Sequence, residues 1–170
     1  MKKRMLLLLL LLPTLLPALF SCRHIEIDRY DPPQLIVVTV EGEYTAVRFG
    51  YRWERERKED AVDYVEPRTY AYEPIPVHAD ESCSIRFSRG YAPEMYIIRF
   101  YPENGGDKRI VDYTINPRAY DPHFTENSSV LLPVTESGIF TVEAVWPEWV
   151  TNSVVTDATY GFAVTVSGRE

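Results

Sequence analysis

The stretches that decide the fold are GIFTVEAVW, residues 138–146, and TYGFAVTV, residues 159–166. In both, apolar side chains occupy alternate positions, which is the period of a β-strand with one buried face. The alternation predicts two buried faces, made of Phe140, Val142, Ala144 and Trp146 in the first stretch and Tyr160, Phe162, Val164 and Val166 in the second. We therefore expect two neighbouring strands that each cover part of one core.

Shorter stretches of the same kind alternate with turn signals along the preceding chain. They predict strands at 35–40, 44–53, 61–65, 82–87, 95–101, 110–114 and 129–132. The Asn104-Gly105 pair indicates a tight hairpin, because both residues tolerate the positive φ that such turns need. No stretch keeps a helical period, so the sequence predicts an all-β fold, an antiparallel sandwich of about seven to nine strands over one core.

The N-terminus has a different composition from the rest of the chain. Lys2, Lys3 and Arg4 precede a leucine-rich run that Pro13 and Pro17 interrupt. A basic start and a short apolar run are typical of an export signal. The run is short for a membrane-spanning helix, which needs ~20 apolar residues. An uncleaved anchor helix is the alternative.

The end of this run, Leu19-Phe20-Ser21-Cys22, resembles the lipobox of bacterial lipoproteins, although Phe20 replaces the smaller residue usual there. The resemblance implies that Cys22 carries a diacylglyceryl group and becomes the N-terminus after cleavage. Acyl chains on Cys22 would then hold the protein at the membrane. The expected organisation is a lipoprotein signal peptide at 1–21, a polar tether at 22–33 and a β-sandwich domain at 34–170.

The charge balance limits the partners of the domain. The chain has 18 basic and 25 acidic residues, a net charge of −7. Without the three basic residues of the leader, 15 basic and 25 acidic residues remain, a net charge of −10. Nucleic acids and anionic lipid surfaces attract basic proteins, so we expect no nucleic-acid partner and no membrane binding through charge.

The sequence contains two cysteines, too few for a disulfide framework. Cys83 shares alternate positions with Ile85 and Phe87, which predicts a buried structural thiol. A disulfide between Cys22 and Cys83 is the alternative if Cys22 is not lipidated, since an oxidising compartment permits it.

Five segments follow one another in an order that resembles a known group of proteins. They are residues 50–53 (GYRW), 62–64 (VDY), 85–87 (IRF) followed by Pro93, 138–146 and 160–166. In this order they look like the uncharacterised immunoglobulin-like lipoproteins and sensor ectodomains of Gram-positive bacteria. The resemblance implies an immunoglobulin-like sandwich in the cell envelope. It implies no particular chemistry.

No catalytic or metal-binding motif stands out in the sequence. The Gly-x-Ser-x-Gly and His-Glu-x-x-His motifs are absent, although Ser82, Ser84 and Ser88 follow His78 closely. Asp112, Asp121 and Glu126 are possible oxygen ligands for calcium, without the loop pattern of a known calcium motif. We expect no catalytic residues, no metal and no cofactor.

Aromatic residues in loops are the candidate binding residues. Trp146 and Trp149 flank Pro147 and Glu148, and Trp is frequent among the residues that dominate binding interfaces. Trp146 also continues the alternation of its strand, so core packing is the alternative for it. Tyr70 and Tyr72, in a proline-rich connector, form a second candidate surface.

Together these patterns predict a lipid-anchored, non-enzymatic protein on the outer side of the cell membrane. We expect it to bind an envelope protein or a wall polysaccharide through loops at one end of the sandwich. The alternatives are an envelope hydrolase, or an inhibitor of one, acting near peptidoglycan, and a passive structural spacer.

Overall fold

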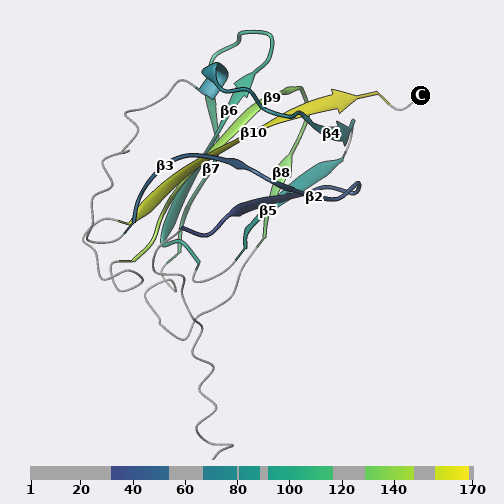
Figure 1. Cartoon of the computed structure of the whole chain (residues 1–170). Coiled ribbons are helices and arrows are strands. Elements are labelled where there is room, and N and C mark those ends of the chain that lie inside the picture. The colour runs from purple at the N-terminus through teal and green to yellow at the C-terminus, as the bar shows by residue number, and fades with distance from the viewer. Residues whose placement is uncertain are drawn as a thin grey trace, which may run out of the picture.

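The computed structural model describes residues 32–53, 67–79, 81–88, 92–116, 129–147 and 156–168. In these ranges the protein is all-β, with two sheets packed against each other (Figure 1). The predicted signal peptide, Cys22, most of the predicted tether and the predicted strand at 61–65 lie outside the described residues.

Sheet A has four strands in the order β2-β1-β5-β8. Their bounds are β1 Leu35–Val38, β2 Glu43–Thr45, β5 Ser82–Phe87 and β8 Val130–Pro133. All neighbours in this sheet are antiparallel.

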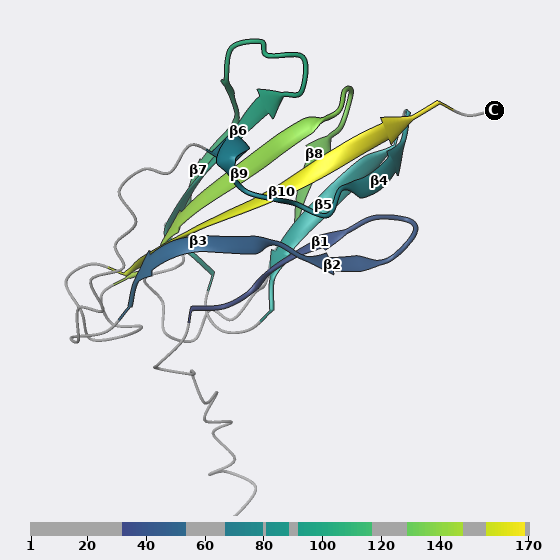
Figure 2. The same cartoon turned by 45° about the horizontal axis from the view of Figure 1, so that its top comes forward.

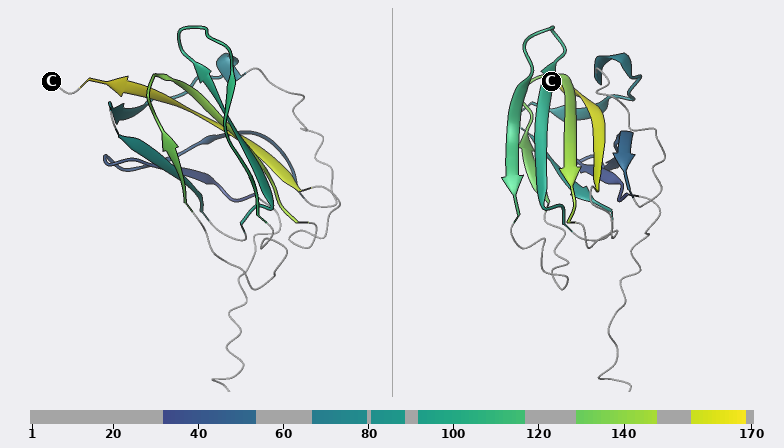
Figure 3. Two further views of the ribbon diagram at one scale, coloured as in Figure 1. Left: turned by 180° about the vertical axis from the view of Figure 1, so that it is seen from behind. Right: turned by 90° about the vertical axis from the view of Figure 1, so that its left-hand side faces the viewer.

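Sheet B has six strands, five of them in the order β3-β10-β9-β6-β7. Its bounds are β3 Val47–Arg52, β4 Ile75–His78, β6 Met95–Pro102, β7 Arg109–Ile115, β9 Gly138–Val145 and β10 Asp157–Ser167. β4 pairs in parallel with the last part of β10, while the other pairs are antiparallel. The right-hand view of Figure 3 shows β7, β6, β9 and β10 side by side.

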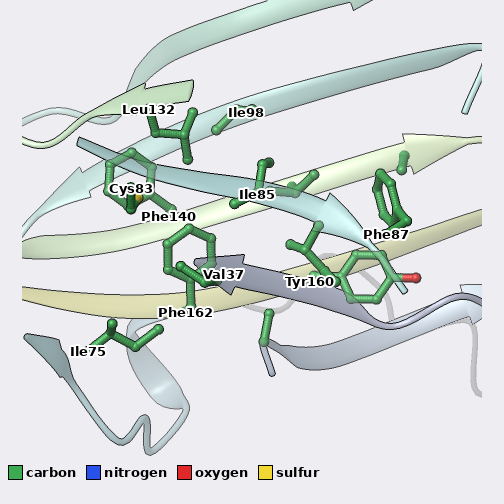
Figure 4. Close-up of a cluster of buried hydrophobic side chains, with 14 of the residues drawn as sticks. Val37, Ile75, Cys83, Ile85, Phe87, Ile98, Leu132, Phe140, Tyr160 and Phe162 are labelled. Carbon is green, nitrogen blue, oxygen red and sulfur yellow. The ribbon is translucent and has the colours of Figure 1, made fainter. Parts of the chain in front are cut away.

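The core lies between the two sheets. Alternate side chains of β1, β5 and β8 meet alternate side chains of β6, β9 and β10 (Figure 4). Phe140 and Phe162 stack with ring centroids 5.3 Å apart, and Phe87 packs edge-on against Tyr160 at 5.9 Å. The predicted alternation in residues 82–87, 138–146 and 159–166 is confirmed, with Val166 partly buried at the end of its strand.

The prediction of one strand over residues 44–53 is wrong. The chain leaves sheet A after Thr45 and enters sheet B at Val47, with Ala46 buried between them. Within β3, Thr159 of β10 pairs with Gly50 and Tyr160 pairs with Arg48, so the register skips Phe49. This β-bulge interrupts the alternation, because two residues of one strand then oppose one residue of the other.

Strand β4 is missing from the sequence prediction. Pro76 lies inside it, and proline cannot donate a hydrogen bond to a neighbouring strand. The strand is short and lies at the border of sheet B, where proline is tolerated. With β4 and the division of residues 44–53, the described residues contain ten strands instead of the expected seven to nine.

The sandwich has two distinct ends (Figure 2). At the end that holds Pro32 and Pro33, the guanidinium of Arg48 donates to the carbonyl of Pro32 at 3.1 Å, and the Tyr160 hydroxyl donates to the carbonyl of Pro33. Strands β1, β6 and β10 begin at this end. At the hairpin end, residues 103–108 join β6 to β7, and Gly105 has the positive φ of 83° predicted for the Asn-Gly turn.

Candidate functional site

Two of the predicted binding residues, Glu148 and Trp149, lie outside the described residues. The same holds for Cys22, the predicted site of lipidation, and for Asp121 and Glu126, two of the possible calcium ligands. These predictions therefore stay predictions.

Trp146 lies in the core and not on a binding surface. Its side chain is 2% exposed and packs edge-on against Trp53 at 5.3 Å and Phe87 at 5.2 Å. A ring enclosed in this way cannot offer a face to a ligand, so the prediction of a binding role for Trp146 is corrected. The physical reason is that the alternation of β9 continues through Trp146 and turns it inward.

Tyr70 and Tyr72 form a packed layer on the outer face of sheet B. The Phe49 ring lies 4.5 Å from that of Tyr70 and 6.1 Å from that of Tyr72. Beneath them lies Gly161 of β10, where a Cβ atom would stand only 2.1 Å from Cζ of Phe49. Both tyrosines are half-buried, so a large part of their surface is used in holding the connector to the sheet.

The connector that carries these tyrosines is fastened at the hairpin end as well. Arg68, in the 3₁₀ turn η1 Pro67–Thr69, donates to the carbonyls of Gly106 at 3.1 Å and Pro102 at 3.5 Å. Its guanidinium carbon lies 5.8 Å from the centre of the Tyr101 ring. Tyr101 and Thr141 are consequently buried although both point to the outer side of sheet B. The connector therefore covers one part of this face.

The other part of the outer face of sheet B is uncovered. Ile110, Tyr113 and Ile115 of β7 are 65%, 53% and 61% exposed. The strand register places Tyr113 beside Ile97, which lies beside Glu143, and places Ile115 beside Met95, which lies beside Val145. We call this surface the open face; it comprises Met95, Ile97, Arg99, Ile110, Tyr113, Ile115, Glu143 and Val145.

In the second half of strand β7, polar residues take the core side. Asp112 and Thr114 lie on the core side, opposite Ile98 and Tyr96, while Tyr113 and Ile115 point outward. The Tyr96 hydroxyl lies 3.4 Å from Oδ2 of Asp112. Burial, with the nearby Asp112 carboxylate, raises the pKa of Tyr96, so its hydroxyl stays protonated and can donate. Because Asp112 and Thr114 take the core side of β7, Tyr113 and Ile115 lie on its solvent side.

The open face carries balanced charge. Arg99 and Glu143, on adjacent strands, form an ion pair at 3.0 Å, and both side chains are partly exposed. Beside Val145, at the border of this face, Asp157 pairs with Arg52, and its hydrogen bond raises the pKa of the guanidinium. A surface that is apolar around one neutralised ion pair has the character of a binding interface rather than of a solvated sheet.

Strand β7 is also the last strand of sheet B among the described residues, but its edge is protected. Ile98 pairs with Asp112 and Arg99 with Ile110, so Val111 forms a bulge. A bulge and an inward-pointing charge such as Asp112 are two devices by which proteins prevent edge-to-edge pairing. The surface open to a partner is therefore the face of the sheet and not its edge.

His78 contacts two residues, but these are not the serines suspected from sequence. Its Nε2 lies 3.4 Å from Oε1 of Glu41, and its Nδ1 lies 3.3 Å from Oγ of Ser167. The carboxylate and the imidazole are both about 40% exposed, so water reaches the groups freely. The three residues link the β1–β2 turn to the ends of β4 and β10.

Two further findings on the described residues concern their chemistry. No group of three or more His, Cys, Asp or Glu side chains gathers there as a metal site would require. Cys83 is buried against the core, as predicted, and burial raises the pKa of its thiol to about 11. A thiol of this kind is a poor nucleophile at neutral pH.

No prediction from the sequence points to the open face. The sequence signal for this face lies in residues 109–115, RIVDYTI, where apolar and polar residues are mixed. What the sequence could not show is that the apolar positions face outward, since alternation is the same for either orientation.

Comparisons with known proteins identified no relative of this chain. A scan of protein-family models, a search of curated proteins and a search of solved structures each found no match. In the part of the chain that the structure describes, no helix has the length and apolar character needed to cross a membrane.

Proposed function

We propose that the chain is a lipid-anchored, non-enzymatic protein of the cell envelope, and that its immunoglobulin-like domain binds a partner through the open face of sheet B. The observation that carries the binding role is the exposure of Ile110, Tyr113 and Ile115 on one strand face. Burying large apolar side chains contributes about 1.5–3 kcal/mol each, so a partner would gain substantially by covering them.

The strand order supports the immunoglobulin-like assignment. Sheet A contains β1-β5-β8 and sheet B contains β10-β9-β6-β7. These orders match A-B-E and G-F-C-C′ of a variable-type immunoglobulin sandwich. Strands β2, β3 and β4 would then be additions to the common frame.

The anchor rests on the lipobox-like segment before Cys22 and on the position of Pro32 and Pro33. The bonds from Arg48 and Tyr160 hold these prolines against the domain, so a tether from Cys22 would reach it at a defined end. Binding through the loop that carries Glu148 and Trp149 stays a separate prediction.

The mass of the mature N-terminus tests the anchor. We expect cleavage before Cys22 and the added mass of acyl chains on the thiol. A chain with an unmodified Cys22 would contradict this part of the proposal.

Paired substitutions test the binding surface. The double variant Tyr113→Ser, Ile115→Ser removes two exposed apolar side chains from the open face, and Leu131→Ser removes an exposed leucine from the outer face of sheet A. Because all three side chains are exposed, we expect both variants to unfold at the same denaturant concentration as the wild type. Partner recovery from cross-linked envelopes should fall ~30-fold or more in the double variant, as for a hot-spot tyrosine, and stay unchanged in Leu131→Ser.

Equal recovery with both variants would mean that the open face binds nothing. The protein would then be better described as a spacer, or as a binder that uses its loops.

A further inference from the structure

We propose that the connector, residues 67–74, is a movable cover, and that the open face continues beneath it as a concealed part of the binding surface. This inference rests on the proposed binding role of the open face and deepens it by naming what limits the access of a partner. The argument uses the position of the covered residues in sheet B and the contacts that hold the connector there.

The covered and the open part of the face belong to the same strands. Arg99 and Tyr101 both point outward from β6, two residues apart, yet the Arg99 side chain is partly exposed while Tyr101 is 3% exposed. On β9 the register places Thr141, which is 4% exposed, beside Arg99. The open face therefore ends within β6 and β9, where the connector begins to cover them, and not at the end of either strand.

The connector lies on sheet B without pairing with it. All of residues 67–74 are described, and none of them belongs to a strand; pairing with β10 begins at Ile75. The amide of Tyr70 donates to the carbonyl of Pro67 at 3.2 Å, which closes the 3₁₀ turn η1, and this turn lies against β9. Strands β6 and β9 are each paired on both sides. A segment outside the strand ladders opens at a lower free energy than such central strands, so the connector can open while the sheet stays intact.

Arg68 fastens the connector at the hairpin end. Its guanidinium donates to the carbonyls of Gly106 at 3.1 Å and Pro102 at 3.5 Å and lies over the Tyr101 ring, but the residue itself is exposed. Water competes for the hydrogen bonds of an exposed group, so the net stabilisation from these bonds is modest. Solvent can therefore replace the contacts that hold η1 above Tyr101.

Tyr70 and Tyr72 fasten the other half of the connector by ring packing. Both rings contact Phe49, and Tyr72 lies over Gly161 of β10. Apolar contacts of this kind are not replaced by water, because separating the rings exposes apolar surface. We expect opening to begin at Arg68 and to uncover Tyr101 and Thr141 first.

Opening of η1 adds a tyrosine ring and a threonine to the open face, next to the ion pair of Arg99 and Glu143. Tyrosine is one of the residues that dominate binding interfaces, so the enlarged face is the better binding surface. A partner that covers both parts needs the connector open, and its apparent affinity is multiplied by the fraction of molecules in that state. The connector is then an internal competitor of the partner.

The experiment is thiol labelling of the folded, full-length chain with N-ethylmaleimide. Thr141→Cys places a thiol beneath the connector with little change in side-chain size, and Ile97→Cys places one on the open face. The native Cys83 is buried in the core of the same molecule, so its labelling reports the opening of the whole domain and shows whether each variant is folded. Peptide masses assign the label to each site, so a thiol at Cys22 does not interfere.

We expect Ile97→Cys to react fastest and Cys83 slowest, with Thr141→Cys between them because the connector opens without the rest of the domain. Adding Arg68→Ala should speed the labelling of Thr141→Cys about tenfold, the effect of losing hydrogen bonds from a charged group. The labelling of Cys83 should not change.

Arg86→Ala is the matched control. It removes an arginine of sheet A that pairs with Glu43 at 2.8 Å, far from the connector in the fold, and should leave the labelling of Thr141→Cys unchanged. Partner recovery from cross-linked envelopes is the second readout. It should rise in Arg68→Ala by about the factor seen in labelling, and stay at the wild-type level in Arg86→Ala.

Labelling of Thr141→Cys at the rate of Cys83 would show that the connector opens only with the whole domain, and would overturn the cover. Labelling at the rate of Ile97→Cys would show that Thr141 is not covered, and would overturn it too. Faster labelling in Arg68→Ala without a gain in recovery would overturn the concealed binding surface. The labelling needs no partner, so the proposed function fails separately, if the double variant of the open face keeps its partner.

Discussion

Gly161 illustrates how a single residue positions a whole segment of this protein. It lies on the outer side of β10, and the rings of Phe49 and Tyr72 occupy the space where a side chain would stand. The absence of a Cβ atom lets the connector lie flat on sheet B. The boundary between the covered and the open part of the face depends on this contact.

Gly161→Ala is therefore expected to destabilise the fold. A Cβ atom would stand 2.1 Å from Cζ of Phe49, so the ring and the connector must shift, at a cost of about 1–3 kcal/mol. Urea unfolding followed by tryptophan fluorescence measures the change. Gly168→Ala is the control, since nothing lies within 4 Å of its Cβ position; an equal effect of both changes would contradict the contact.

The thiol of Cys83 predicts a dependence of stability on alkaline pH. Its pKa is about 11 in the folded protein against 9.0 as the ordinary value, because burial disfavours the thiolate. The folded protein therefore holds the thiol proton more tightly than the unfolded chain does. This group contributes its full stabilisation below pH 9 and loses it as the pH rises toward 11. The loss is on the order of 2–3 kcal/mol.

The measurement is the difference in unfolding free energy between the wild type and Cys83→Ala at pH 8 and at pH 11. The variant has a cavity and should be less stable at pH 8, but its stability should fall less between the two values. Parallel declines in both proteins would show that other groups, such as the tyrosines, cause the whole effect.

At the scale of elements, the hairpin between β6 and β7 determines which side chains lie on the outer face of sheet B. The turn at Asn104 and Gly105 joins β6 to β7, and the Asn104 side chain accepts a hydrogen bond from the amide of Gly106 at 3.2 Å. Arg109 then pairs with Glu136 at 2.8 Å and covers the Phe100 ring at 4.7 Å, which closes the core at this edge. The hairpin thus fixes the register that sets the open face.

Gly105→Ala is expected to cost about 1–2 kcal/mol, since its φ of 83° is unfavourable for a residue with a Cβ atom. Gly106→Ala, one residue later and without a positive φ, is the control and should cost less. Thermal unfolding of both variants checks this difference. If both changes shift the midpoint equally, the conformation of the turn does not limit stability.

For the whole molecule, the topology joins distant parts of the chain. Strand β10, near the C-terminus, pairs with β3, β4 and β9, and β1 pairs with β5. Bringing distant strands together costs loop-closure entropy before their contacts contribute any stability. All-β sandwiches consequently refold in roughly milliseconds to seconds.

We expect refolding of the wild type in this range, measured by stopped-flow fluorescence of the tryptophans, of which Trp53 and Trp146 are in contact. Microsecond refolding would contradict the importance of the distant pairs. The Tyr113→Ser, Ile115→Ser variant should refold at the wild-type rate, because these exposed side chains do not contribute to the core.

The candidate site was predicted less well than the fold. The sequence predicts binding by loop tryptophans because tryptophan is common in interfaces, but Trp146 is core and Tyr70 and Tyr72 are largely packed against the sheet. Residue type alone cannot tell a ring that packs inward from one that faces a partner. That difference depends on the strand and the face on which the ring lies.

The sequence by itself determined the all-β class, the strands at 82–87, 138–146 and 159–166, the hairpin at Asn104 and the burial of Cys83. These features follow from local alternation and from the turn preferences of single residues, which need no distant neighbour. Only the tertiary structure decided the division of residues 44–53 between two sheets, the strand around Pro76 and the outward orientation of Ile110, Tyr113 and Ile115. Each of these depends on which distant strand lies alongside, because pairing sets the register, and register sets the face to which a side chain points.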